Sequence, residues 1–272
     1  MTRFVCYIPS YNDSVLVTQS LASVPEWEVV ISDNASNRDH ALAIERLSGP
    51  SVRVVHQPRQ LGRVGNWKFC VEHFLASGAT WMKFLMAGDR LKPNSLSLCR
   101  RAVSQFPDTR SIVFNVEIVN SQGATRWSTA TQPRVLPPRE SMLEIVRGGN
   151  VFFGLLAALV HADTVREGFS FGGEILSYCA DMYFQVEIGR RWPTLFYPDV
   201  LAEFITTNRR TYSVGQFSLE HLVEEVLVKL RASGYYAELT DDYQTQKQIP
   251  ALLGTWLRGG LDHLQARQTG EG

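Results

Sequence analysis

Cysteine is scarce in this chain, and its spacing argues against two kinds of scaffold. The four cysteines, Cys6, Cys70, Cys99 and Cys179, lie far apart, and none belongs to a C-x-x-C pair. A zinc site or a disulfide framework normally needs cysteines at short, repeated spacings. We therefore expect reduced, buried cysteines, as in a cytoplasmic protein.

Excess charge and long apolar runs are also missing. The 27 lysines and arginines balance 27 aspartates and glutamates, so the whole chain offers no electrostatic attraction for nucleic acid. The longest apolar candidate, 151–160, is about half the length of a membrane-spanning helix. The amino terminus reaches Pro9 too soon for the apolar region of a signal peptide. We expect a soluble, cytoplasmic protein and leave peripheral contact with the inner membrane open.

Short apolar segments alternate with helical patterns over the first third of the chain. The apolar segments are 4–8, 27–31, 52–56 and 81–86. Helices are expected between them and again at 95–105, 139–147, 219–230 and 250–264, with a further strand at 111–119. The segment 151–160 fits either a buried strand or a tight helix. This alternation predicts an α/β fold with a mostly parallel, doubly wound sheet.

The stretch W-M-K-F-L-M-A-G-D-R-L-K-P-N, residues 81–94, organises this pattern. It reads as a buried strand that breaks at Gly88 and presents one carboxylate, Asp89. Two other predicted strands end in polar residues, S-Y-N at 10–12 and D-N at 33–34. A turn with a solvated Asp is the alternative for Asp89 alone. Because open α/β sheets bind ligands beyond the carboxyl ends of their strands, the repetition favours a nucleotide-like ligand.

Four motifs in this region resemble the nucleotide-binding half of family-2 glycosyltransferases, which have the GT-A fold. They are I-P-S-Y-N, I-S-D-N-A-S, L-G-R-V-G-N-W-K-F and W-M-K-F-L-M-A-G-D-R-L-K-P. Two later motifs, G-F-S-F-G-G-E-I-L-S-Y-C-A-D-M-Y-F-Q and T-T-N-R-R-T-Y-S, extend the resemblance to about residues 4–215. It implies a GT-A (Rossmann-like) domain over 1–215, with a nucleotide-sugar half (1–119) and an acceptor half (120–215). A helical extension (216–264) and a tail (265–272) would follow.

The resemblance implies a transferase that moves a hexose-like sugar from a nucleoside diphosphate to an acceptor hydroxyl with inversion. The acceptor would be a saccharide or glycolipid, in polysaccharide or glycoconjugate synthesis. Asp181 falls where the family has its catalytic base. A carboxylate near a helix start and among apolar neighbours would have the raised pKa that this role favours. An ordinary first-turn helix aspartate is the alternative.

The remaining site residues also follow from the resemblance. Asp89 would hold Mn²⁺ or Mg²⁺, and Arg209 and Arg210 would contact the diphosphate. The predicted nucleotide-binding residues are Pro9, Ser10, Tyr11, Asn12, Asp33, Arg63, Asn66, Lys68 and Gly88. The chain departs from the family where two acids are usual, because Ala87 and Gly88 precede Asp89.

Two other functions stay open at this point. A nucleotide-sugar-binding protein without catalysis would account for the reduced acid motif. A nucleotidyltransferase shares the sheet but usually has a Gly-rich loop after its first strand, which P-S-Y-N-D-S lacks. The carboxyl-terminal helices leave homo-oligomerisation open.

Overall fold

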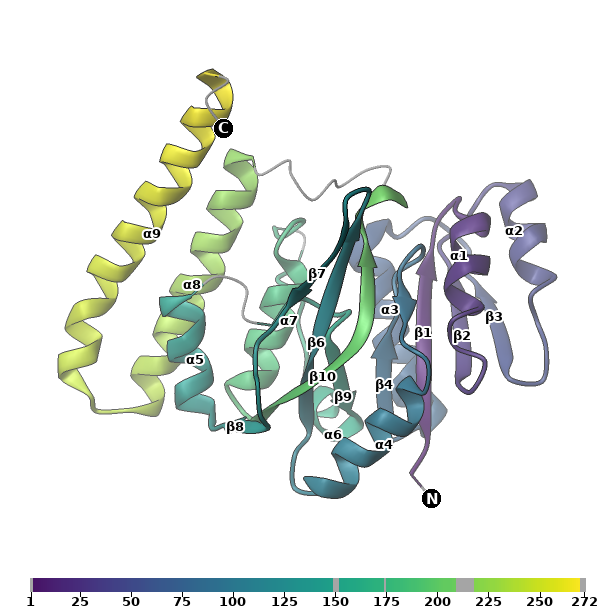
Figure 1. Cartoon of the computed structure of the whole chain (residues 1–272), viewed down its shortest axis with the longest axis horizontal. Helices are drawn as coiled ribbons and strands as arrows, with labels where there is room; N and C mark the ends of the chain where they lie inside the picture. The colour runs from purple at the N-terminus through teal and green to yellow at the C-terminus, as the bar shows by residue number, and fades with distance from the viewer. Residues whose placement is uncertain (1, 149–151, 174, 209–217, 270–272) are drawn as a thin grey trace.

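In the computed structural model, residues 2–148, 152–173, 175–208 and 218–269 are described, and over them the chain forms a ten-stranded sheet flanked by helices (Figure 1). The strands are β1 (Phe4–Ser10), β2 (Glu28–Asp33), β3 (Val52–His56), β4 (Trp81–Phe84), β5 (Arg90–Leu91), β6 (Ser111–Asn120), β7 (Gly123–Trp127), β8 (Arg134–Leu136), β9 (Ala158–His161) and β10 (Thr194–Ile205). The helices are α1 (Ser14–Leu21), α2 (Arg38–Glu45), α3 (Gly62–Ser77), α4 (Ser95–Gln105), α5 (Pro138–Arg147), α6 (Ala162–Arg166), α7 (Ala180–Gly189), α8 (Leu219–Leu239) and α9 (Tyr243–Thr269), with a 3₁₀ turn η1 (Thr206–Asn208).

The strand order is β3-β2-β1-β4-β9-β6-β10-β5, with β7 paired to β6 and β8 paired to β10. Strands β3, β2, β1 and β4 run parallel, and β6 and β10 are parallel to each other. Strand β9 lies antiparallel between β4 and β6. The predicted mostly parallel sheet is therefore confirmed, and the end of the 151–160 segment contributes the antiparallel strand.

The near-continuous apolar sequences of β1 and β4 follow from burial on both faces of the sheet. Phe4, at the start of β1, stacks on Trp81 of β4 with ring centroids 6.3 Å apart and meets Trp27 edge to face. Helix α3 ends where Gly78 adopts φ +70°, a left-handed conformation that glycine adopts without strain. The four cysteines are free and buried, as expected.

Helices α8 and α9 stand at the end of the sheet away from β3 (Figure 1), where α8 packs on α5 and α7. Lys229 of α8 is fully buried and donates hydrogen bonds to the carbonyl oxygens of Ile145 (2.7 Å) and Gly148 at the end of α5. Its ammonium also lies 5.0 Å from the ring centroid of Trp256 in α9. One lysine therefore links three helices.

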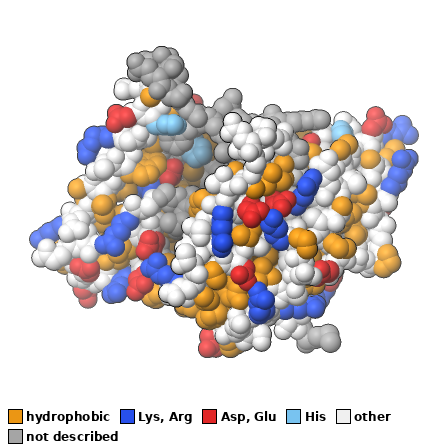
Figure 2. Space-filling model, in the orientation of Figure 1, with side chains coloured by type: hydrophobic (Ala, Val, Ile, Leu, Met, Phe, Trp, Pro, Cys, Tyr) orange, Lys and Arg blue, Asp and Glu red, His pale blue; other side chains and the backbone are white. Residues whose placement is uncertain are grey.

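The surface agrees with the balanced composition. Figure 2 shows Lys and Arg interspersed with Asp and Glu over the visible face, without a broad area of one sign. Among the described helices, none combines the length and the apolar character needed to cross a bilayer.

Candidate active site

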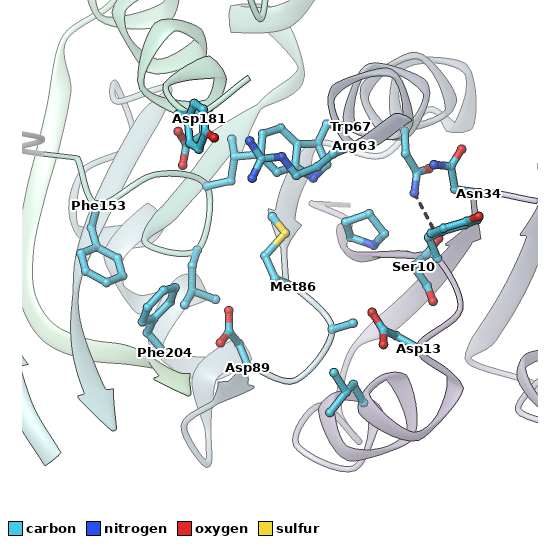
Figure 3. Close-up of a pocket in the computed structure, with 18 of the residues that line it drawn as sticks. Ser10, Asp13, Asn34, Arg63, Trp67, Met86, Asp89, Phe153, Asp181 and Phe204 are labelled. Atoms are coloured by element: carbon cyan, nitrogen blue, oxygen red, sulfur yellow. Dashed lines mark hydrogen bonds between the residues drawn. The ribbon is translucent and has the colours of Figure 1, made fainter. Parts of the chain in front are cut away.

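A cavity of about 460 Å³ opens beyond the carboxyl ends of β1, β2 and β4 (Figure 3). One side is formed by residues that follow the strands or begin α3, namely Ser10, Tyr11, Asp13, Asn34, Arg63 and Asn66. The other side is formed by later segments, namely Phe153, Leu155, Leu156, Tyr178, Asp181 and Phe204. Met86, Ala87 and Asp89 line it as well, and Figure 3 shows Met86 between the two sides. The predicted strand-end residues Ser10, Tyr11 and Asp89 thus meet Asp181 in one cavity.

Asn66 ties the strand ends to α3. Its side-chain oxygen accepts a hydrogen bond from the Ser32 hydroxyl (2.6 Å), and its Nδ2 donates to the carbonyl oxygens of Ser32 (3.2 Å) and Ser10 (3.5 Å). Asn34, which follows β2, binds the start of α3 in a similar way. Its side chain accepts a hydrogen bond from the Leu61 amide (2.8 Å) and donates one to the Gly62 carbonyl oxygen (3.1 Å). These amides hold the wall in place.

Ser10 lines the cavity and carries a buried hydroxyl. The residue is 4% exposed, and its Oγ has no hydrogen-bond partner among the described residues. A buried hydroxyl without a partner costs about 1–3 kcal/mol, which a polar ligand in the cavity would recover. The Ser10 hydroxyl therefore keeps unused hydrogen-bonding capacity on the strand-end side of the cavity.

Asp33, predicted to contact a nucleotide base, is bound to neighbouring protein groups in the structure. One carboxylate oxygen pairs with His56 Nδ1 (2.8 Å), and the other accepts from the Ser36 amide (3.3 Å). His56 also pairs with Glu45 (2.8 Å), and its pKa is raised, mainly by the hydrogen bond with Asp33. Asp33 is absent from the cavity lining. Its visible role is to join the end of β2 to β3.

Three more predicted residues lie outside the lining of this cavity. Asn12 accepts a hydrogen bond from the Asn37 amide (2.8 Å) and so braces a turn. The Lys68 side chain is 64% exposed, because it lies 100° around α3 from the cavity-lining Trp67. Its ammonium lies 3.8 Å from the carboxylate of Glu72, one turn further along the helix. Gly88 supplies φ +95° at the bend after β4. Arg209 and Arg210 fall outside the described residues.

Asp89 is held from two sides. It is 1% exposed, its Oδ1 accepts from the Ile205 amide (2.9 Å), and its carbonyl oxygen accepts from the Ser20 hydroxyl (2.8 Å). Within the described residues, no group of three or more His, Cys, Asp or Glu side chains is arranged to hold a metal ion. Mg²⁺ in phosphoryl-substrate sites often takes only one or two carboxylates, with phosphate oxygens and water completing the shell. Asp89 fits a metal site that the substrate completes.

Lys83, beneath this turn, links β4 to the opposite wall. Its ammonium is fully buried and donates to the carbonyl oxygens of Phe84 (2.8 Å), Leu155 (3.4 Å) and Leu156. Burial lowers the pKa of Lys83 to about 8, while the charge of Asp89 opposes that change. Sequence reasoning missed this role, because Lys83 lies inside an otherwise apolar strand.

Asp181 lies in the first turn of α7, as predicted, and lines the cavity. Its Oδ1 accepts from the Met182 amide (2.8 Å). Burial raises the pKa of Asp181, and the positive charge of Arg63 acts against the rise. Arg63 itself lies over the Trp67 ring at 5.1 Å from the centroid, on the side of the cavity near Asp181 in Figure 3.

Gly154 makes room for the Asp181 carboxylate. It adopts φ +69°, and a Cβ added there would lie 2.1 Å from Asp181 Oδ2. Its carbonyl oxygen accepts from Gln185 of α7 (2.6 Å), which fixes the two segments together. The preceding residue, Phe153, is also left-handed at φ +51° and packs edge to face on Phe204 at 5.3 Å. Gly154 adopts this conformation without strain, whereas Phe153 is strained, and strained residues of this kind are common at functional sites.

Residues 6–155 match the family described as Glycosyl transferase family 2. The match spans more than half of the chain, so the chain belongs to glycosyl transferase family 2. The family predicted from the four motifs is thereby confirmed. No curated protein sequence is significantly similar to the chain.

Solved glycosyltransferases share the fold. S. aureus TarS 1–349 in complex with UDP-GlcNAc aligns with a TM-score of 0.65 and 13% identity, over 94% of this chain and 80% of that one. The mannosyltransferase PcManGT from Pyrobaculum calidifontis, in complex with GDP-Man and Mn²⁺, gives 0.59 and 14%, over 99% and 76%. GalNAc-T7 with UDP, GalNAc and Mn²⁺ gives 0.58 and 14%, over 98% and 58%. The chain therefore has the GT-A fold.

Proposed function

We propose that this glycosyltransferase transfers a hexose-like sugar from a nucleoside diphosphate to an acceptor hydroxyl, with inversion at the anomeric carbon. The observation that carries the proposal is the meeting of the strand-end wall and a buried carboxylate, Asp181, in one cavity. TarS and PcManGT, which share the fold, are described with UDP-GlcNAc and GDP-Man bound.

On the donor side, Ser10 and Tyr11 would contact the nucleoside. The Ser10 hydroxyl is buried and lacks a partner, so it can hydrogen-bond to the nucleoside without first breaking another bond. Asp89 would hold a divalent cation together with the diphosphate oxygens. When bound, such a cation offsets the negative charge that develops on the departing diphosphate. Arg63, and Arg209 with Arg210, would add positive charge near the phosphates.

On the acceptor side, Asp181 would take the proton of the attacking hydroxyl. Inversion needs one base on the face opposite the leaving group, and Asp181 lies across the cavity from Ser10 (Figure 3). Its raised pKa makes it a stronger base than an exposed aspartate. Phe153 and Phe204 form an apolar wall beside it for the acceptor.

We place the reaction in polysaccharide or glycoconjugate synthesis, with a saccharide or glycolipid acceptor, at the cytoplasmic side of the inner membrane. A second candidate, a nucleotide-sugar-binding protein without turnover, is favoured by Ala87, which stands where the family usually has an acid.

A thermal-shift panel of UDP, GDP, dTDP and CMP, with and without Mn²⁺, tests the donor class. A ligand that binds only the folded chain raises the melting temperature by mass action. We expect one diphosphate to give a shift that grows with Mn²⁺ in the wild-type chain but not in Asp89→Asn. The absence of a shift with every nucleotide would contradict the proposal.

A further inference from the structure

A glutamate on α8 binds the backbone that leads into α7. Glu224 accepts hydrogen bonds from three consecutive amides, those of Ser177 (2.8 Å), Tyr178 (2.6 Å) and Cys179 (2.8 Å). The residue is 7% exposed, and its two carboxylate oxygens share the three donors. Glu224 therefore holds a turn whose last residue, Cys179, lies 45 positions before it in the chain.

These amides belong to the turn that leads into α7 and ends at its N-cap residue, Cys179. The first N–H groups of a helix lack partners within the helix, and a side chain at the N-cap usually supplies one. Cys179, the N-cap of α7, makes no such side-chain bond. From α8, Glu224 accepts from the amide of this N-cap residue and from the two amides before it, and Asp181 follows Cys179 by only two residues.

We propose that Glu224 is a positioning residue, which holds the 177–179 turn so that the Asp181 carboxylate stays directed toward the acceptor hydroxyl. This role rests on the proposed function of Asp181 as the base. Other contacts hold the same turn, since His221 of α8 stacks on Tyr178 with ring centroids 5.5 Å apart. On the far side, Gly154 lies against the carboxylate itself.

A glutamine at this position would not reproduce the arrangement. Its amide offers one acceptor oxygen, and its NH₂ group would point a donor at the backbone N–H groups. At least one amide would lose its partner in a buried site, and the turn would relax. The effect should fall mainly on the chemical step, because the hydrogen bonds that hold Asp89 come from Ser20 of α1 and Ile205 of β10.

The charge of Glu224 gives a second readout. The positive end of the α7 dipole favours an ionised Asp181, and a carboxylate at that end offsets the effect. Among the described residues, the other charged or titratable groups that act on Cys179 and Asp181 are Arg63 of α3 and His221 and Glu225 of α8. Removing the Glu224 charge should therefore lower the pKa of Asp181.

The test compares Glu224→Gln with Glu225→Gln. Glu225 is adjacent on α8 and similarly buried (8% exposed), but it interacts with Lys229. For each variant, kcat and KM are measured across pH with the donor found in the nucleotide panel, together with nucleotide Kd. For E224Q we expect kcat to fall about 10-fold or more and the nucleotide Kd to stay within about twofold of wild type. The acid limb, which is the fall of the rate at low pH, should move to lower pH. E225Q removes a neighbouring charge but leaves the three bonded amides in place, so it should retain the wild-type kcat.

Wild-type kcat and an unmoved acid limb in E224Q would overturn the positioning role alone. A wild type without turnover of any donor would overturn the proposed function and this role together. If E224Q fails to fold, Glu224→Asp keeps the charge and both oxygens on a shorter arm. E224D should then show a reduced kcat and faster hydrogen exchange at 177–179, with the wild-type acid limb because the charge is kept. Wild-type kcat together with wild-type hydrogen exchange would refute the role.

Discussion

Replacing Gly154 by alanine should damage catalysis much more than stability. The backbone there has φ +69°, where an L-residue costs about 1–2 kcal/mol. The new Cβ would lie 2.1 Å from Asp181 Oδ2, well inside van der Waals contact. The carboxylate must therefore retreat by about 1 Å or more, and a displacement of that size can cost about 100-fold in rate. We expect kcat for release of the nucleoside diphosphate to fall by about that factor.

Gly78→Ala is the matched control. Gly78 has φ +70°, and a Cβ added there meets no atom within 4 Å. Both substitutions should lower the free energy of unfolding through the left-handed backbone, and Gly154→Ala should lower it by about 1–3 kcal/mol more through crowding, as measured by denaturant titration. Only Gly154→Ala should slow the turnover of the folded chain. Wild-type kcat in Gly154→Ala, with the expected loss of stability, would show that the Asp181 carboxylate at this position is not the base.

Two further substitutions test the two sides of the cavity. Asp181→Asn should abolish turnover and leave nucleotide Kd unchanged. In the wild type, kcat/KM should fall as the pH drops through a pKa above that of an ordinary aspartate, because the base must be ionised; an acid limb at or below the usual value of about 3.9 would contradict this. Ser10→Ala should weaken nucleotide binding by about 5- to 10-fold, which is the loss expected for one hydrogen bond. It should not lower the free energy of unfolding, because the Ser10 hydroxyl has no partner among the described residues. Unchanged affinity in a calorimetric titration would exclude that contact.

The sequence pattern was enough for the sheet and for one edge of the site. Apolar segments such as 4–8 and 81–86 are buried on both faces, so their composition alone indicates parallel strands. Because parallel strands end at the same edge, Ser10 and Asp89 could be placed together. The family resemblance added Asp181, whose place in the first turn of α7 the structure shows.

Contacts between distant segments were beyond the same reasoning. Asp33 is engaged by His56, a partner that follows only from the register of β2 and β3. Glu224 is one of several acids on an amphipathic helix, and no local pattern marks it as the cap of α7. Phe153 and Gly154 read as part of an apolar run, whereas their left-handed backbone shapes the wall at Asp181.

The central claim is inverting transfer from a nucleotide sugar with Asp181 as the base. NMR of the first sugar product from an α-linked donor, released to water or to an acceptor, tests it most directly. We predict the β-anomer in the first product of the wild-type chain and no product from Asp181→Asn. An α-anomer in the first product, or equal release by Asp181→Asn, would contradict the claim.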